Sequence, residues 1–264
     1  SKKLEYNDFI EKIQNIFPCN NLKFINYSLE NDFNHILDLE DSVSYFEKKK
    51  ARKIVSDLFN NEEFLGKIKN KYIWIRINNL SSTESTKDMV EILSEKNVLS
   101  NITGIIIPKV SSEKDVKYFL QILRSIENNI KLSDSSFETG RLYIQLLIES
   151  SDGLYNLKEI SKYNGIIALI SGLYDYKDSI GSWDIFNQYP ELLYQKKKII
   201  NICRKSNLIS VESITPVLNF DMAFTESLLS YNINFITKWS VYPTHAEGIR
   251  YSKNLKLFLD DNHI

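Results

Sequence analysis

Short apolar runs recur along the chain, and amphipathic segments separate most of them. Most of these runs are continuous rather than strict alternations of apolar and polar positions. Continuous runs are typical of parallel strands that are covered on both faces. They predict eight strands, at residues 21–27, 35–41, 72–78, 102–110, 142–150, 165–173, 208–214 and 234–243.

The segments between the predicted strands space their apolar residues as helices do. Val116, Phe119 and Leu123, for example, fall on one face of a helix. The first residues of the chain, SKKLEYNDFIEKI, read as an amphipathic helix rather than a signal peptide. We expect helices at residues 1–20, 44–60, 85–95, 112–128, 155–163, 189–206, 221–231 and 244–264.

Strands that alternate with helices favour parallel βαβ units. Eight such strands suit a closed (β/α)8 barrel better than an open sheet, and no GxGxxG motif follows the first predicted strand. We therefore predict an α/β protein with a single TIM-barrel domain over residues 1–264. The start of the chain departs from this alternation, because only seven residues separate the strand at 21–27 from the strand at 35–41.

Composition adds little detail but excludes several classes of protein. The chain has 264 residues, and its formal net charge of −1 gives no long-range attraction for nucleic acid or an anionic membrane. No apolar run approaches the roughly 18 residues of a membrane-spanning helix. Cys19 and Cys203 lie far apart and form no CxxC pair, which is typical of buried thiols in a reduced protein. We expect a cytoplasmic protein.

Charged residues gather where several predicted strands end. In a TIM barrel the catalytic residues lie at the C-terminal ends of the strands, so these side chains would meet at one mouth if the barrel forms. Burying such groups costs free energy unless they have partners or a task. They are Asp38 and Glu40 after the second strand, Arg76 on the third, Lys109 after the fourth, Glu149 on the fifth and Asp175 after the sixth.

The chemistry of these groups suits a hard divalent cation. Magnesium commonly takes one or two carboxylates together with water and substrate oxygens, as Glu149 and Asp175 could provide. Arg76 could bind a substrate carboxylate bidentately. The alternative is that the acids cap helices or form ion pairs with Lys48, Lys109 and Arg52, and spacing does not choose between these two interpretations.

The strings DLED, RIN and PKV belong to six ordered motifs across residues 35–250 that resemble the citrate lyase β-subunit and HpcH/HpaI aldolase family. HILDLEDSV followed by KKKAR resembles the family's DLED strand and the helix after it. YIWIRIN resembles its "vRiN" strand, and GIIIPKV resembles its "PKv" strand. LLIESSDGLYNLKEI, LISGLYDYKDSIG and TKWSVYPTHAEGI resemble three later motifs in the family's order. No single motif is specific, but six in sequence identify the family.

The resemblance implies a magnesium-dependent carbon–carbon lyase of the aldolase type, acting beside a 2-oxo acid or acyl carbonyl through an enolate. It places Glu149 and Asp175 as magnesium ligands, with Glu149 also beside the substrate. It places Arg76 on the substrate carboxylate and Asp38 and Glu40 as the acidic pair near the metal, and it implies that these three residues are catalytic. The implied partners are a small 2-oxo or hydroxy acid and further copies of the chain, in a trimer or hexamer.

Other functions stay open at this point. An acyl-CoA lyase of the malyl- or citryl-CoA type would share the site, although the opening segment LKFINYSLEN lacks the family's arginine and proline. A Schiff-base aldolase would use Lys109 as its nucleophile, whereas the family resemblance places Lys109 among the substrate-binding residues. A non-catalytic family member is the third alternative.

Overall fold

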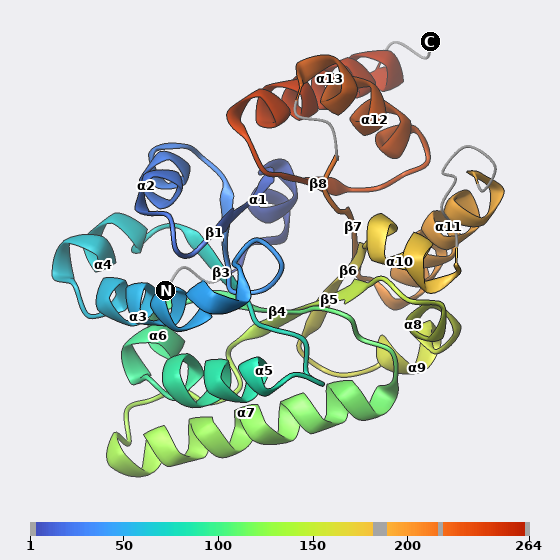
Figure 1. Ribbon diagram of the computed structural model, residues 1–264. Coiled ribbons are helices and arrows are strands. Elements are labelled where there is room, and N and C mark those ends of the chain that lie inside the picture. The colour runs from blue at the N-terminus through green and yellow to red at the C-terminus, as the bar shows by residue number, and fades with distance from the viewer. Residues whose placement is uncertain (1–3, 182–188, 216–218, 262–264) are drawn as a thin grey trace.

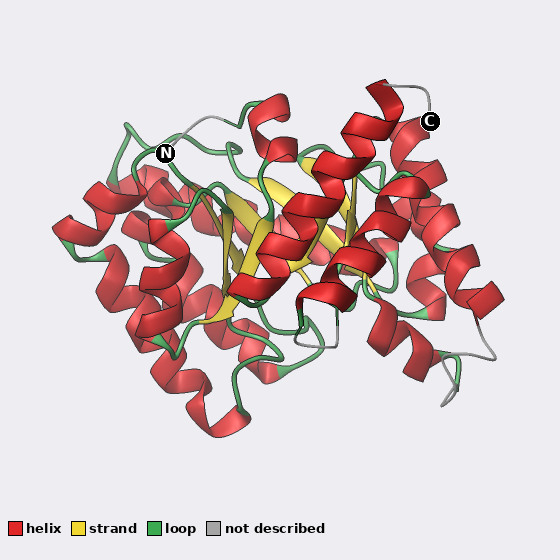
Figure 2. Cartoon of the chain, turned by 90° about the horizontal axis from the view of Figure 1, so that it is seen from above, coloured by secondary structure: helices red, strands yellow, loops and turns green. Residues whose placement is uncertain are grey.

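Eight parallel strands form a closed barrel, each hydrogen-bonded to the next in chain order, with β8 returning to β1. The computed structural model describes residues 4–181, 189–215 and 219–261. Helices surround the strands on the outside, as Figures 1 and 2 show from two directions. The predicted (β/α)8 barrel is therefore confirmed. The strands are β1 (Gln14–Pro18), β2 (Asn34–Asp38), β3 (Tyr72–Arg76), β4 (Gly104–Ile107), β5 (Tyr143–Ile148), β6 (Ile166–Ser171), β7 (Ile209–Glu212) and β8 (Thr237–Ser240).

The helices lie before β1, between the strands and after β8. None of those in the described parts of the chain has both the length and the apolar character needed to cross a bilayer. They are α1 (Tyr6–Glu11), α2 (Leu22–Glu30), η1 (Tyr45–Glu47), α3 (Lys48–Phe59), α4 (Glu62–Ile68), α5 (Thr83–Asp88), the π-helical η2 (Met89–Leu93), α6 (Lys96–Asn101), α7 (Glu113–Ser133), α8 (Ser151–Tyr155), α9 (Leu157–Ile160), α10 (Leu173–Ser179), α11 (Tyr189–Ser206), α12 (Phe220–Asn232) and α13 (Pro243–Asp261).

The predicted start of the barrel is wrong. Residues 21–27 form part of helix α2 rather than a strand, and the segment predicted as a helix over 1–20 contains β1. Asn21 caps α2 by accepting hydrogen bonds from the backbone N–H groups of Lys23 and Phe24. The helix buries Ile25, Ser28 and Leu29. Because α2 connects β1 to β2, the short spacing in the sequence prediction disappears.

The inside of the barrel is filled by alternate residues of the strands, as expected from the two-residue period of a strand. One apolar cluster contains residues from most of the strands, and its largest members are the aromatic rings of Tyr72, Trp74 and Trp239. A second, larger cluster joins the outer faces of the strands to the helices. Since Ile36 and Trp74 face inward, the same alternation turns Asp38 and Arg76 into the C-terminal mouth of the barrel.

Candidate active site

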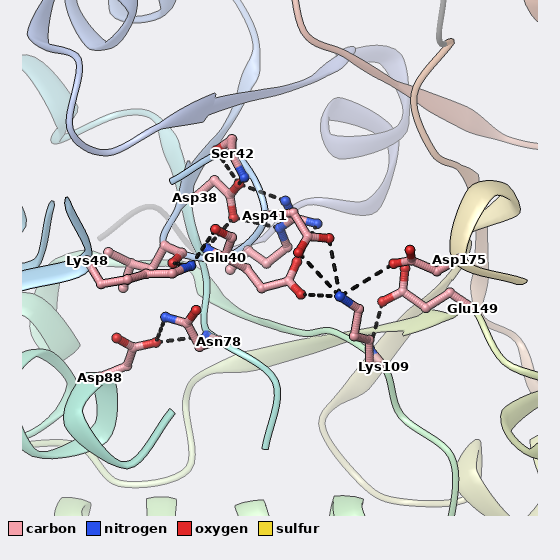
Figure 3. Close-up of polar contacts among 12 residues, drawn as sticks. Asp38, Glu40, Asp41, Ser42, Lys48, Asn78, Asp88, Lys109, Glu149 and Asp175 are labelled. Carbon is pink, nitrogen blue, oxygen red and sulfur yellow. Dashed lines mark hydrogen bonds and ion pairs between the residues drawn. The ribbon is translucent and has the colours of Figure 1, made fainter. Parts of the chain in front are cut away.

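The C-terminal ends of the strands enclose a cavity of about 330 Å³. Asp38, Arg76, Glu149 and Asp175 line it, so the structure brings four of the six predicted site residues to one cavity. Glu40 does not line the cavity, but it contacts Arg76 and Lys109. Lys109 in turn contacts Asp175. Figure 3 shows the labelled members of this group lying around the mouth.

Asp38 and Arg76 form a buried bidentate pair across β2 and β3. The Arg76 Nε and NH2 groups donate to the two carboxylate oxygens at 2.6 and 2.7 Å. Asp38 also accepts hydrogen bonds from the backbone N–H groups of Glu40 and Ser42 and from the Ser42 hydroxyl. Burial alone would raise the pKa of Asp38, but the charge and hydrogen bonds of Arg76 outweigh it and lower that pKa. Asp38 is therefore held as a carboxylate.

Glu40 lies between two cations. Its Oε2 is 3.0 Å from Arg76 NH1, and its Oε1 is 2.9 Å from Lys109 Nζ. Burial raises the pKa of Glu40 in spite of the nearby Arg76 charge. Arg76 is thus fixed from two sides by acids, and its guanidinium lies 5.6 Å from the ring of Trp239 on the opposite wall.

Lys109 links the acidic loop after β2 to the acids of β5 and α10 (Figure 3). Its ammonium lies 3.3 Å from Asp41 and 3.5 Å from Asp175, in addition to the contact with Glu40. Its backbone has a φ of 53°, in the left-handed region that few side chains adopt. In this conformation the Lys109 N–H donates to Glu149 Oε1 at 2.9 Å. Such strain is commonly found where a functional group must be positioned.

Glu149 and Asp175 form a carboxylate pair at the far side of the mouth. Burial is the largest reason that the pKa of Glu149 is raised well above its ordinary value, and the charge and hydrogen bonding of Asp175 add to it. Gly172 leaves the space for this pair, because a Cβ there would lie 2.6 Å from Glu149 Cβ and 2.9 Å from its Oε2. Two adjacent acids that repel one another are the arrangement that a divalent cation stabilises.

The donor set fits magnesium. Within the described ranges, no three His, Cys, Asp or Glu side chains are grouped as a complete protein cage for a metal ion. Magnesium does not need one, since it usually keeps waters and uses one or two carboxylates with substrate oxygens. Glu149 and Asp175 would supply those carboxylates, and the adjoining cavity would admit water and substrate.

Two basic residues of α3, Lys48 and Arg52, stabilise the walls of the site. Lys48 Nζ donates to the backbone carbonyls of Leu39 and Glu40, which fixes the loop after β2. Arg52 forms ion pairs with three acids of α5 and η2. These acids are Glu84, Asp88 and Glu91, and Asp88 also accepts hydrogen bonds from the backbone and side chain of Asn78 (Figure 3).

Some residues of the site were not singled out from the sequence. Trp239 and Ser42 look like ordinary core and loop residues in the sequence, and only the closed barrel brings them to Arg76 and Asp38. Glu212, the last residue of β7, does not line the cavity: it lies 3.1 Å from the buried Lys238 and also pairs with Lys196 of α11. Its pKa is lowered because the charges of Lys238 and Lys196 outweigh burial.

Comparison with known proteins finds a matching family model and related sequences. Residues 27–227 match the family model described as HpcH/HpaI aldolase/citrate lyase. An L-malyl-CoA/beta-methylmalyl-CoA lyase of Rhodobacter capsulatus is 26% identical over 227 residues, which cover 78% of this chain and 67% of that protein. A citrate lyase subunit beta of Leuconostoc mesenteroides subsp. cremoris is 24% identical over 221 residues, covering 81% and 67%.

Solved structures share the fold. A citrate lyase from Burkholderia xenovorans superposes with a TM-score of 0.77 at 15% identity, over 95% of this chain and 83% of that one. A citrate lyase beta subunit from M. tuberculosis, complexed with oxaloacetate and magnesium, gives a TM-score of 0.71 at 15% identity, over 93% and 98%. The family model covers most of the sequence, including the segments that carry Asp38, Arg76, Glu149 and Asp175. The chain belongs to the HpcH/HpaI aldolase/citrate lyase family.

Proposed function

We propose that the chain is a magnesium-dependent carbon–carbon lyase that cleaves or forms a bond beside the carbonyl of a 2-oxo acid. The observation that carries this proposal is the pair formed by the buried Glu149 and the partly exposed Asp175, which shares one cavity with Arg76. The likeness to lyases of the same family supports it. When bound, magnesium would act as a Lewis acid that stabilises negative charge on the substrate oxygen.

Arg76 would orient the substrate. Its Nε and Nη2 each donate one hydrogen bond to Asp38, and its Nη1 faces Glu40. The remaining N–H groups of the guanidinium can bind a substrate carboxylate. Asp38 and Glu40 then act as positioning residues that fix the guanidinium. Glu149 and Asp175 would hold the cation, and Arg76 would hold the 2-oxo acid in an orientation suited to bond cleavage.

The proton would move on the β2 side of the cavity. In the cleavage direction a 4-hydroxyl loses its proton and becomes a carbonyl, the C3–C4 bond breaks, and its electron pair forms an enolate that is then protonated at carbon. Asp38 is held as a carboxylate by Arg76 and is a poor base. We assign the proton transfer to Asp41, which lines the cavity and is half-exposed there.

Lys109 is poorly suited to act as a Schiff-base nucleophile. A nucleophilic lysine must lose its proton, which burial or a neighbouring cation promotes. Here three carboxylates surround the ammonium, and although burial alone would lower the pKa of Lys109, the hydrogen bond and charge of Glu40 raise it. We propose that Lys109 contributes to substrate binding by neutralising the acids at the mouth.

Four related statements stay predictions. An acyl-CoA lyase would use the same carboxylates and Arg76, and the malyl-CoA lyase relative favours it as the second candidate. A homo-oligomer, trimeric or hexameric, and a cytoplasmic location are implied by the family resemblance and the composition. A single domain over residues 1–264 is the remaining prediction, and the continuous barrel supports it.

Exchange of the pyruvate methyl protons for deuterium tests the proposal directly, because it reports enolate formation without a second substrate. We expect NMR to detect exchange with magnesium and wild-type protein, and to detect none with a chelator or with Glu149→Gln. Asp41→Asn should slow the exchange while magnesium still binds. Exchange that persists in chelator, together with borohydride trapping on Lys109, would refute the metal-dependent route in favour of a Schiff base.

A further inference from the structure

The mouth of the barrel has two chemically different halves. The half over β2, β3 and β5 carries Asp38, Arg76 and Glu149. The half over β1, β7 and β8 is mainly apolar, and all of its wall residues except Pro18 belong to or pack against the apolar cluster inside the barrel. The apolar wall consists of Ile16, Pro18, Ile214, Trp239 and Val241.

This apolar wall is continuous with the floor of the cavity. Ile16 and Trp239 lie in the inward-facing cluster and are almost fully buried. Ile214 and Val241 pack against the same cluster from above and remain half-buried, so they are open to the cavity. A cavity of about 330 Å³ is within the range that takes ligands considerably larger than a three-carbon oxo acid.

The cavity also lacks the means to bind a second carboxylate. Arg76 is the one basic residue among the described residues that line it, and Asp38 already binds that guanidinium bidentately. The ammonium of Lys109 is shared among Glu40, Asp41 and Asp175. A distal carboxylate would therefore lie against apolar side chains without a cation, which costs free energy.

We propose that the apolar wall is a subsite for an alkyl or aryl substituent, so that the substrate is an apolar 4-hydroxy-2-oxo monocarboxylate rather than a dicarboxylate. The inference rests on the proposed function, because the carboxylate and oxo groups of such a substrate lie in the polar half. Its apolar substituent then extends beyond C3 toward Val241 and Ile214. Cleavage releases pyruvate and an apolar aldehyde.

Calorimetric titration of the magnesium-loaded protein with a chain-length series tests this subsite. The ligands are pyruvate, 2-oxobutanoate, 2-oxopentanoate and 2-oxohexanoate, with oxaloacetate as the dicarboxylate. Each added methylene that is buried should lower the Kd roughly threefold to fourfold, so 2-oxohexanoate should bind roughly 50-fold more tightly than pyruvate. Oxaloacetate should bind more weakly than 2-oxopentanoate.

Two matched variants locate the effect. Val241→Asp introduces a charge into the apolar wall and should abolish the gain per methylene. Val90→Asp makes the same change on η2, where Val90 is 65% exposed and outside the cavity, and should keep the gain. A gain that survives in Val241→Asp would overturn the assignment of the wall.

The remaining outcomes separate the subsite from the function on which it rests. Binding of pyruvate with no gain along the series, or tighter binding of oxaloacetate, overturns the subsite and leaves the metal-dependent lyase intact. Tighter binding of S-acetylpantetheine than of 2-oxohexanoate also overturns it, in favour of a thioester arm on the same wall. Binding of none of these compounds overturns the subsite and the proposed function together.

Discussion

Replacement of Asp38 by asparagine is expected to destabilise the protein strongly. Asp38 is fully buried and accepts two hydrogen bonds from Arg76 and three from Glu40 and Ser42. Asparagine keeps the shape of the side chain but removes the charge and turns an NH2 group toward donors. The variant leaves the buried Arg76 without its main counter-ion, a change that costs about 3–5 kcal/mol in comparable pairs.

Urea denaturation followed by circular dichroism measures this loss as a shift of the unfolding midpoint. Asp57→Asn is the matched control, because Asp57 forms a surface pair with Lys53 at 2.9 Å and its side chain is 62% exposed. Exposed pairs of this kind contribute about 0–1 kcal/mol. A combined Asp38→Leu and Arg76→Met variant should recover most of the lost stability, since it removes both charges.

The pH dependence of the same pair has a defined sign. Because the pKa of Asp38 is lowered in the folded state, its contribution to stability is present above the ordinary carboxyl pKa. The contribution is lost as the pH falls through the folded-state pKa. Equal destabilisation by Asp38→Asn and Asp57→Asn at neutral pH would refute the reasoning.

Three further predictions concern other residues around the barrel. Burial lowers the pKa of His35 from 6.5 to about 3, so its contribution to stability is present above pH 6.5 and is lost as the pH falls toward 3. In urea denaturation, His35→Gln should lack this pH-dependent part of the stability, which is worth up to about 1.4 kcal/mol per pH unit. An unchanged pH profile of stability in the variant would contradict the prediction. Gly172→Ala should weaken magnesium binding roughly tenfold or more by displacing Glu149. The control Gly66→Ala in α4, with nothing within 4 Å of the added Cβ, should instead stabilise the protein by about 0.5–1 kcal/mol. Equal magnesium affinities of the two variants in calorimetry would count against this role of Gly172. Lys109→Gly should be about 1 kcal/mol more stable than Lys109→Ala in urea denaturation, because only alanine retains the strain of the left-handed backbone. The opposite order of stability would show that the backbone at residue 109 is not strained.

Seven of the eight strands could be predicted from the sequence because each lies within a segment rich in apolar residues, although β8 itself (TKWS) is mostly polar. β1 could not, since its five residues QNIFP include Gln14 and Asn15, which are buried but polar. Both side chains have partners that only the closed barrel provides: Trp239 Nε1 donates to Gln14, and Asn15 donates to the carbonyl of Ser240. The helix α2 was mistaken for a strand although Ile25 and Leu29 have helical spacing.

The acids and Arg76 could be predicted as site residues because they follow apolar strands, where burial without a task is costly. The way in which these residues pair with one another could not be predicted from the sequence. The position of Lys109 depends on its left-handed backbone. Its side chain contacts Glu40, which lies 69 positions earlier in the sequence, and Asp175, which lies on the other side of Lys109 in the sequence. The sequence interpretation also counted Glu40 among the catalytic residues, and that role stays a prediction; in the structure Glu40 does not line the cavity and contacts Arg76 and Lys109.

The most direct test of the central claim is calorimetric titration of magnesium into wild type and Glu149→Ala, with and without pyruvate. Glu149 and Asp175 are the carboxylates that we assign to the cation, and Asp57→Ala on the exposed face of α3 serves as a control. We predict that wild type and the control bind magnesium, that pyruvate tightens this binding, and that Glu149→Ala loses both effects. Equal magnesium affinity in Glu149→Ala and wild type would contradict the account.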